Sequence, residues 1–168
     1  GMKDWILGKD NKRNKWFWNS LIKNLKQVNR LNELNESNFL DYFYITDFIK
    51  CRSKTEELKP FKKEQEDKNL ELLEKEINSV SPKLIIVFGS RAWGGIQKIY
   101  HNNIERLTKE IGKGSSLMEC HGYLFKVKDK DIYIIPLAHF SGRNNFLRNS
   151  YSEYLKEGIC SFKDKERG

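Results

Sequence analysis

Residue types that can do chemistry directly follow the apolar runs that the sequence predicts as strands. In chain order they are Asp10, Asp47, the triplet Gly89, Ser90 and Arg91, and His139. Ligands bind outside the carboxyl ends of the strands in open parallel sheets. We therefore expect one edge of a sheet to collect two carboxylates, a histidine and several bases. Ordinary turn chemistry accounts for about half of such residues, since strands usually end in polar loops.

Hydrophobic patterns predict the elements that must position these residues. The predicted strands cover, in chain order, residues 5–7, 42–46, 84–88, 123–127 and 132–137, the last two joined by a polar turn at 128–130. The predicted helices begin at residue 16, span 64–78 and 91–100, and close the chain at 151–156. Strands that alternate with helices predict an α/β fold, a three-layer α/β/α sandwich with a short, mainly parallel central sheet. The uninterrupted apolar run Leu84–Phe88 is typical of a strand covered on both faces, so we expect it inside the sheet.

Length and composition limit the class of protein. The chain has 168 residues, which predicts a single domain over 1–168. Its 31 Lys and Arg against 23 Asp and Glu give a net charge of +8, which fits a nucleic-acid partner and equally a Lys-rich soluble protein. Three widely spaced cysteines are typical of reduced thiols in the cytoplasm. No apolar run approaches the ~20 residues of a membrane helix. We expect a monomeric cytoplasmic protein without a signal peptide.

Four short motifs follow one another in a recognisable order. They are Asn14-Lys15-Trp16-Phe17-Trp18, Thr46-Asp47 followed by Lys50-Cys51-Arg52, Pro82-Lys83 with the apolar strand that ends in Gly89-Ser90-Arg91-Ala92, and the closing stretch from Ile134 to Gly142 around His139. Together they resemble the uracil-DNA glycosylase superfamily, especially its small microbial and mismatch-specific branches. The resemblance implies the superfamily's fold, DNA as partner, and a repair enzyme that hydrolyses the N-glycosidic bond of a flipped, damaged or mismatched base.

The resemblance also implies roles for individual residues. His139 and Asp10 would be catalytic, the histidine by donating a hydrogen bond to the departing base and the aspartate by orienting water. Asp47 and Phe17 would line the base pocket. The DNA-binding residues would be Lys50, Arg52, Gly89, Ser90, Arg91, Ser141, Gly142, Arg143, Asn144 and Asn145.

Three departures from the superfamily pattern leave a second interpretation open. The Pro-Tyr that should follow Asp10 is absent, and Phe140 replaces the proline of the closing motif. Asp47 replaces the asparagine that reads uracil, and an ionised carboxylate accepts hydrogen bonds but donates none. Asp47 would therefore suit a base that presents an amino group. The alternative is a catalytically inactive nucleic-acid-binding module on the same fold.

We expect neither a metal nor another cofactor. Cys51 stands where the iron–sulfur branches have a cluster ligand, but the other cysteines of that pattern are missing. A zinc site at Cys120, His121 and Cys160 is disfavoured because adjacent residues rarely bind one tetrahedral ion. The turn at 88–94 also resembles that of nucleotidyltransferases. The stretch 96–103 contains no carboxylate to hold Mg²⁺, so we reject that alternative.

Overall fold

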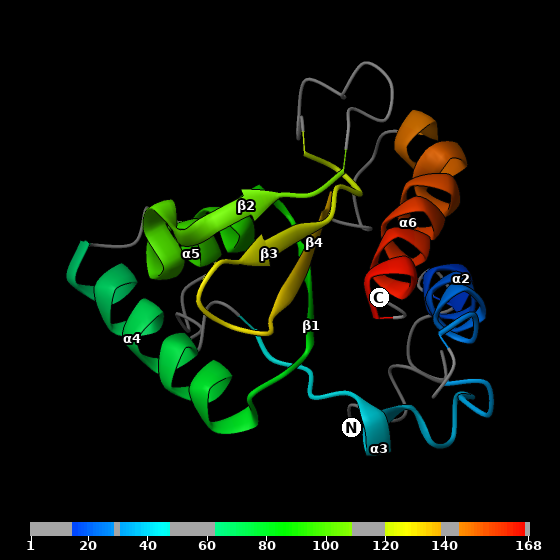
Figure 1. The fold of residues 1–168 in the computed structure, drawn as a ribbon, viewed down its shortest axis with the longest axis horizontal. Helices are drawn as coiled ribbons and strands as arrows, with labels where there is room; N and C mark the ends of the chain where they lie inside the picture. The colour runs from blue at the N-terminus through cyan, green and yellow to red at the C-terminus, as the bar shows by residue number, and fades with distance from the viewer. Residues whose placement is uncertain (1–14, 29–30, 48–62, 109–119, 139–144, 167–168) are drawn as a thin grey trace, which may run out of the picture.

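The computed structural model describes residues 15–28, 31–47, 63–108, 120–138 and 145–166. The helices and strands of Figure 1 are α2 (Lys15–Leu25), α3 (Phe39–Tyr42), α4 (Lys63–Val80), β1 (Leu84–Phe88), α5 (Ser90–Tyr100), the 3₁₀ helix η2 (His101–Asn103), β2 (Ile104–Arg106), β3 (Phe125–Val127), β4 (Tyr133–Leu137) and α6 (Asn145–Glu166). The strand predicted at 5–7 lies outside these ranges. No helix in the described ranges is long and apolar enough to cross a membrane.

In the described part of the chain, the central sheet has four strands in the order β1-β4-β3-β2. β1 and β4 pair in parallel, from Leu84 opposite Tyr133 to Phe88 opposite Leu137. β3 is antiparallel to both of its neighbours. The sheet is therefore mixed rather than mainly parallel. The reason is the short polar turn between β3 and β4, because a connection of a few residues can join only antiparallel strands.

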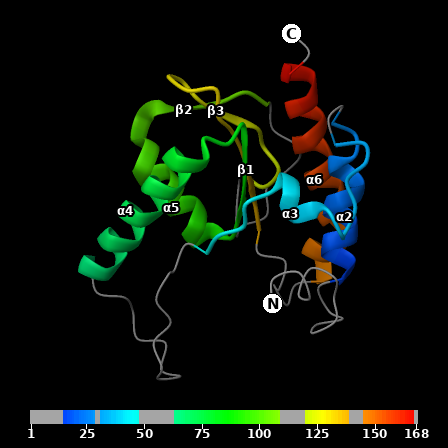
Figure 2. The same cartoon turned by 90° about the horizontal axis from the view of Figure 1, so that it is seen from below.

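Helices cover both faces of this sheet, which confirms the three-layer α/β arrangement. Figures 1 and 2 show α4 and α5 on one side and α2 and α6 on the other. Alternate residues of β1 face the two layers: Leu84 and Ile86 pack toward α2 and α6, whereas Ile85 and Val87 pack toward α4 and α5. This double cover explains why the strand is apolar at every position.

Among the described residues the expectation that β1 lies inside the sheet is wrong, because β1 forms the edge of their sheet. The segment expected to form another strand, 42–46, carries no strand pairing: Tyr42 ends α3, and residues 43–47 have no ladder partner in the described chain. The side chains still alternate as in a strand. Phe43 and Ile45 pack on the core, while Tyr44 between them is 60% exposed. That alternation is what the sequence pattern detected.

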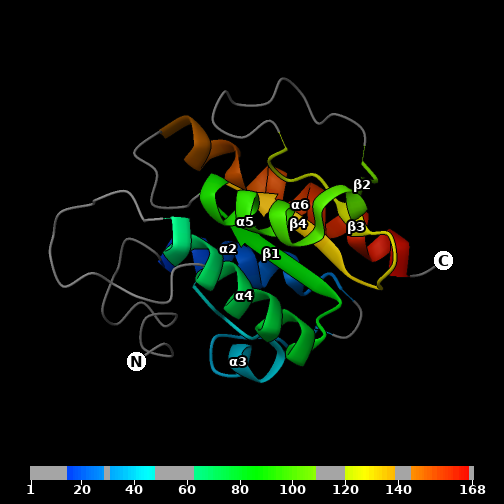
Figure 3. The same cartoon turned by 90° about the vertical axis from the view of Figure 1, so that its left-hand side faces the viewer.

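The lengths of two helices follow the positions of their buried residues. Helix α4, predicted over 64–78, spans Lys63–Val80 and buries Leu73 and Ile77 four residues apart on one face. Helix α6, predicted over 151–156, is much longer, since it runs from Asn145 to Glu166. Its buried residues Leu155, Ile159 and Phe162 follow helical spacing and extend the apolar face beyond the predicted end. Figure 3 shows the layers from the side of α4.

Candidate active site

The carboxyl ends of β1 and β4 meet at one point of the sheet edge. Their parallel register places Phe88 opposite Leu137. The backbone N–H of Gly89 then donates to the carbonyl oxygen of Leu137 at 2.7 Å, one residue beyond the last strand pair. The turn that begins at Gly89 thus lies beside the end of β4, one residue before Ala138, the last described residue ahead of His139.

Gly89 has a backbone conformation that only glycine adopts readily. Its φ of 92° and ψ of 151° lie in a region closed to residues with a Cβ. This conformation turns the chain from β1 directly into α5, whose first turn carries the exposed residues Ser90 and Arg91. The first backbone N–H groups of a helix lack intrahelical partners and favour anions. The turn after β1 therefore presents the kind of group that binds a phosphate.

Gly89→Ala should lower the free energy of unfolding by about 1–3 kcal/mol, because alanine is strained at this φ and ψ. Gly94 is the matched control in the same helix. A Cβ at Gly94 would meet nothing within 4 Å. Gly94→Ala should therefore stabilise the protein by about 0.5–1 kcal/mol. Urea denaturation midpoints of the two variants measure both effects, and equal shifts in the same direction would contradict this interpretation of the turn.

His121 supports the same junction from the other side. The side chain is 2% exposed, and its Nδ1 accepts a hydrogen bond from the backbone N–H of Ala138 at 2.8 Å. Because Nδ1 accepts, the ring carries its proton on Nε2. Burial lowers the pKa of His121 from 6.5 to about 4, so the ring is neutral near pH 7. The sequence suggested for His121 only a disfavoured zinc site, because its contact with Ala138 pairs residues 17 apart in the chain and leaves no local pattern.

Acid should destabilise the wild-type protein through His121. The unfolded histidine, with a pKa near 6.5, binds its proton before the folded one does, whose pKa is about 4. The free energy of unfolding should therefore fall as the pH drops from 6.5 to 4, by about 3 kcal/mol in total, and this contribution should be constant above and below that window. The variant His121→Asn has no side chain that titrates in this pH range, so its stability should lack this pH dependence. Urea unfolding of both proteins at pH 7, 5.5 and 4 tests this prediction, and parallel pH profiles would contradict it.

The other predicted site residues are only partly placed. Most of them lie outside the described residues, namely Asp10, Lys50, Arg52, His139, Ser141, Gly142, Arg143 and Asn144. Asn145 is the first residue of α6. Asp47 is exposed at the end of the extended segment that follows α3. Phe17, assigned to the base pocket, is fully buried, and its ring packs edge-on against Phe88 with centroids 5.1 Å apart.

A cavity of about 490 Å³ lies along β1. Its walls come from β1 and the segment 42–46 together with residues of α2, α3, α4, α5 and α6, and they are mostly apolar and aromatic. The lining includes Thr46 and Phe88, the residues that immediately precede Asp47 and Gly89. A hydrogen bond of 2.8 Å from the Thr46 hydroxyl to the Glu76 carboxylate lies in this wall. The volume and the mostly apolar lining fall within the usual range of small-molecule sites.

The described residues contain no group of three or more His, Cys, Asp or Glu side chains that could hold a metal ion.

Positive charges of α5 are partly balanced by an acid of α4. Glu66 accepts a hydrogen bond from Lys98 at 2.5 Å. That bond, the Lys98 charge and, to a smaller extent, the Arg91 charge hold the pKa of Glu66 below its usual value. Arg91 therefore lies within electrostatic reach of an acid of α4.

Comparison with known proteins identifies the family. A family model described as the uracil DNA glycosylase superfamily matches residues 10–163, which is most of the chain. Searches of curated proteins and of solved structures gave no match. The matched range includes both strand ends of the junction and the buried histidine that supports it. The chain belongs to the uracil DNA glycosylase superfamily.

Proposed function

We propose that the protein is a DNA glycosylase that removes a damaged or mismatched base by hydrolysing its N-glycosidic bond. The observation that carries this proposal is the junction of β1 and β4, where Gly89 is hydrogen-bonded to Leu137 in a chain of this superfamily. This junction supports the proposal because the start of α5, whose N–H groups can bind an anion, lies beside the end of β4, just before His139 in the sequence. A glycosylase needs both groups close together, because it must hold the DNA backbone and reach the bond of the extruded base.

The start of α5 is the proposed phosphate contact. Backbone N–H groups at Ser90 and Arg91 can donate to a phosphate beside the flipped nucleotide, and the Arg91 side chain adds positive charge. Further contacts are assigned to Lys50 and Arg52 and to the residues after β4, which are Ser141, Gly142, Arg143, Asn144 and Asn145. Such contacts position the protein on DNA, while the base is read separately.

His139 is the proposed electrostatic catalyst. When the N-glycosidic bond breaks, its electron pair stays on the base nitrogen, and the sugar carbon becomes positive. A hydrogen bond from His139 to an oxygen of the departing base stabilises the negative charge. Water then adds to the sugar carbon and releases a proton, and the base anion takes up a proton. Asp10 is assigned the orientation of this water.

Asp47 is the proposed base-reading residue, at the rim of the cavity along β1. Thr46 and Phe88 line this cavity, and an extruded base can stack on its aromatic walls. The Asp47 carboxylate accepts hydrogen bonds only and so favours a base with an amino group. Phe17 supports this wall from behind Phe88, since its own ring is fully buried.

Incubation with a panel of labelled duplexes tests the proposal. Each duplex carries one uracil, one mismatched base or one alkylated base, and hot alkali afterwards cleaves the strand at every abasic site. We expect cleavage of at least one duplex by the wild-type protein and much less by His139→Ala. Cleavage of none, with DNA binding retained, would instead support the inactive binding module.

A further inference from the structure

The cavity along β1 is larger than a pyrimidine base needs. Its volume of about 490 Å³ lies in the range of sites that enclose a whole drug-sized molecule. Its lining includes both Leu84 and Phe88, the two ends of β1, which lie about 13 Å apart at about 3.3 Å per residue. A uracil ring would leave much of this space unfilled, and side chains around an unfilled void lose their contacts.

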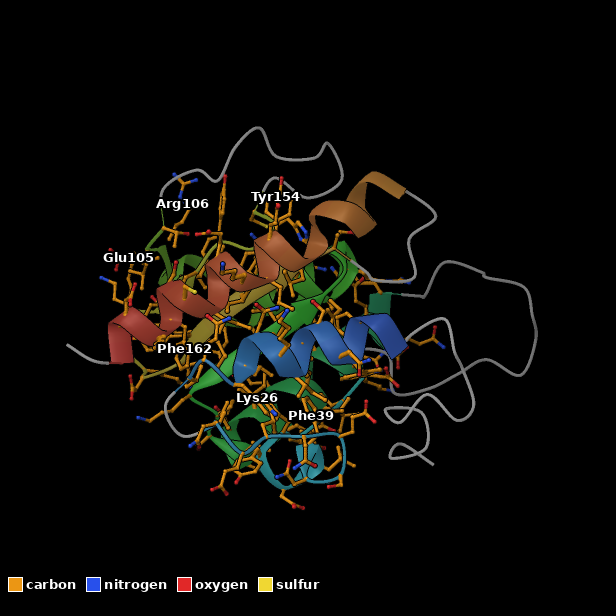
Figure 4. All side chains as sticks on the ribbon, turned by 90° about the vertical axis from the view of Figure 1, so that its right-hand side faces the viewer. Lys26, Phe39, Glu105, Arg106, Tyr154 and Phe162 are labelled. Carbon is orange, nitrogen blue, oxygen red and sulfur yellow. The ribbon has the colours of Figure 1, made fainter. Side chains whose placement is uncertain are left out.

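Apolar and aromatic side chains form most of the wall of this cavity. Phe39 of α3 and Phe162 of α6 belong to the wall, and Figure 4 labels both of them. Ile85 and Ile86 of β1 also line the cavity, and both are only half-buried by the protein. A ligand that covers such apolar surface removes it from water, which favours binding roughly in proportion to the covered area. The wall therefore favours a ligand with an extended apolar part.

The charged side chains of the lining are Glu76 and Lys83. Lys83 has a partner outside the lining, because its Nζ lies 3.8 Å from the carboxylate of Asp131. The Glu76 carboxylate accepts the hydroxyl of Thr46 at 2.8 Å, and both of these residues line the cavity. The two oxygens of a carboxylate offer about four acceptor positions. Glu76 can therefore accept an N–H group of a ligand in addition to Thr46, whereas it repels a carbonyl oxygen.

We propose that this cavity binds an adenine-type base that carries an alkyl group on its amino nitrogen, in preference to uracil. The inference rests on the proposed function and deepens it, because it names the class of damaged base. An alkylated amino nitrogen keeps one N–H, which matches the carboxylate of Glu76. The purine ring and the alkyl chain cover apolar wall that a pyrimidine ring leaves uncovered.

Binding of free bases tests this ligand class without any need for catalysis. Isothermal titration calorimetry gives the Kd of uracil, of adenine and of adenines with a methyl, ethyl, propyl or butyl group on the amino nitrogen. Each added CH₂ should lower the Kd about fourfold until the cavity is filled, and uracil should bind most weakly. Equal Kd values along the alkyl series, or tightest binding of uracil, would overturn the inference.

A pair of substitutions on α4 tests whether the alkyl chain occupies this cavity. Val80 lines the cavity and is 44% exposed, and the larger ring of Val80→Phe should raise the Kd of the butyl base about tenfold by taking up space. Leu72 is 46% exposed on the same helix and lies outside the lining, so Leu72→Phe is the matched control and should leave the Kd unchanged.

A second pair tests the contact with the amino group. Glu76→Gln keeps the size of the side chain but removes its charge, so it should raise the Kd of the alkylated bases about tenfold. Glu74→Gln removes an exposed carboxylate of the same helix that lies outside the lining, and it should have no effect. An unchanged Kd in Val80→Phe or in Glu76→Gln would contradict the inference. The series of bases on the wild-type protein remains decisive if a variant does not fold.

Single-turnover base release separates this inference from the proposed function. At saturating enzyme, a duplex with the alkylated adenine should lose its base faster than a duplex with uracil. Faster release of uracil would overturn the inference and leave the glycosylase proposal intact. Release of no base from any duplex, together with the expected series of Kd values for free bases, would contradict the proposed function alone, and the cavity would remain a site for alkylated adenines.

Discussion

Replacing His139 by alanine is expected to slow single-turnover base release about a hundredfold or more, the cost of losing one preorganised donor to the departing base. The Kd for DNA should change little, because the phosphate contacts are assigned to other residues. The measurement uses enzyme in excess over a labelled duplex, so that product release does not limit the rate. The rate measured in this way reports the free-energy barrier between the enzyme–DNA complex and the transition state.

His101→Asn is the matched control for this variant. His101 is exposed in η2 and belongs to no part of the proposed site, so its replacement should leave the rate unchanged. Equal rates for wild type and His139→Ala would contradict the catalytic assignment. A large loss of DNA affinity in His139→Ala, with the bound complex reacting normally, would make His139 a binding residue.

Replacing Asp47 by asparagine is expected to shift base preference toward uracil by about tenfold to a hundredfold, measured as the ratio of single-turnover rates on two duplexes. One duplex carries uracil, and the other carries a damaged base with an amino group in the place of the uracil O4. The amide of asparagine can donate to O4, whereas the carboxylate of Asp47 repels it. The size of this shift follows from the free-energy cost of leaving a polar group of the base without a hydrogen-bond partner in the site.

Asp41→Asn removes a carboxylate from the same part of the chain and is the matched control. Asp41 is exposed in α3 and is assigned no contact with the base. It should leave the ratio unchanged. A ratio in Asp47→Asn equal to that of wild type would show that Asp47 does not read the base, and a shift in both variants would point to the loss of negative charge alone.

The sequence predicted those parts of the fold that local patterns determine. The α/β class, β1, the β3–β4 hairpin and α4 follow from apolar runs, helical spacing and a polar turn. The position of β1 at the edge of the described sheet did not follow. An apolar strand indicates cover on both faces, which α2, α6, α4 and α5 supply, but it does not say how many strands lie beside it.

The segment 42–46 shows how a pattern and a structure differ. Its alternation of Phe43 and Ile45 with exposed residues is that of a strand, and it does pack on the core. A strand also needs a partner for its backbone. In the described chain, Tyr42 closes α3 instead, and Thr46 is tied to Glu76 through its side chain. Pairing is a property of the tertiary fold, which the sequence pattern does not report.

For the candidate site, the sequence predicted which residues follow the strands but not what holds them. The adjacency of Gly89 and Ala138 follows from parallel pairing of β1 and β4. The role of His121 could not be predicted, because its partner is a backbone N–H distant in sequence. The one local signal was the pair His121-Gly122 just before a strand, which indicates a turn and nothing more.

The most direct test of the central claim is the mass of the products after a single turnover. Wild-type protein in excess is incubated with each duplex of the panel, and the masses of the free base and of the DNA strand are measured by mass spectrometry. The proposed function predicts, for at least one duplex, a released base and a full-length strand that has lost that base and gained water at the sugar. If the protein binds the duplexes but all of them are recovered with unchanged mass, the proposed function is contradicted.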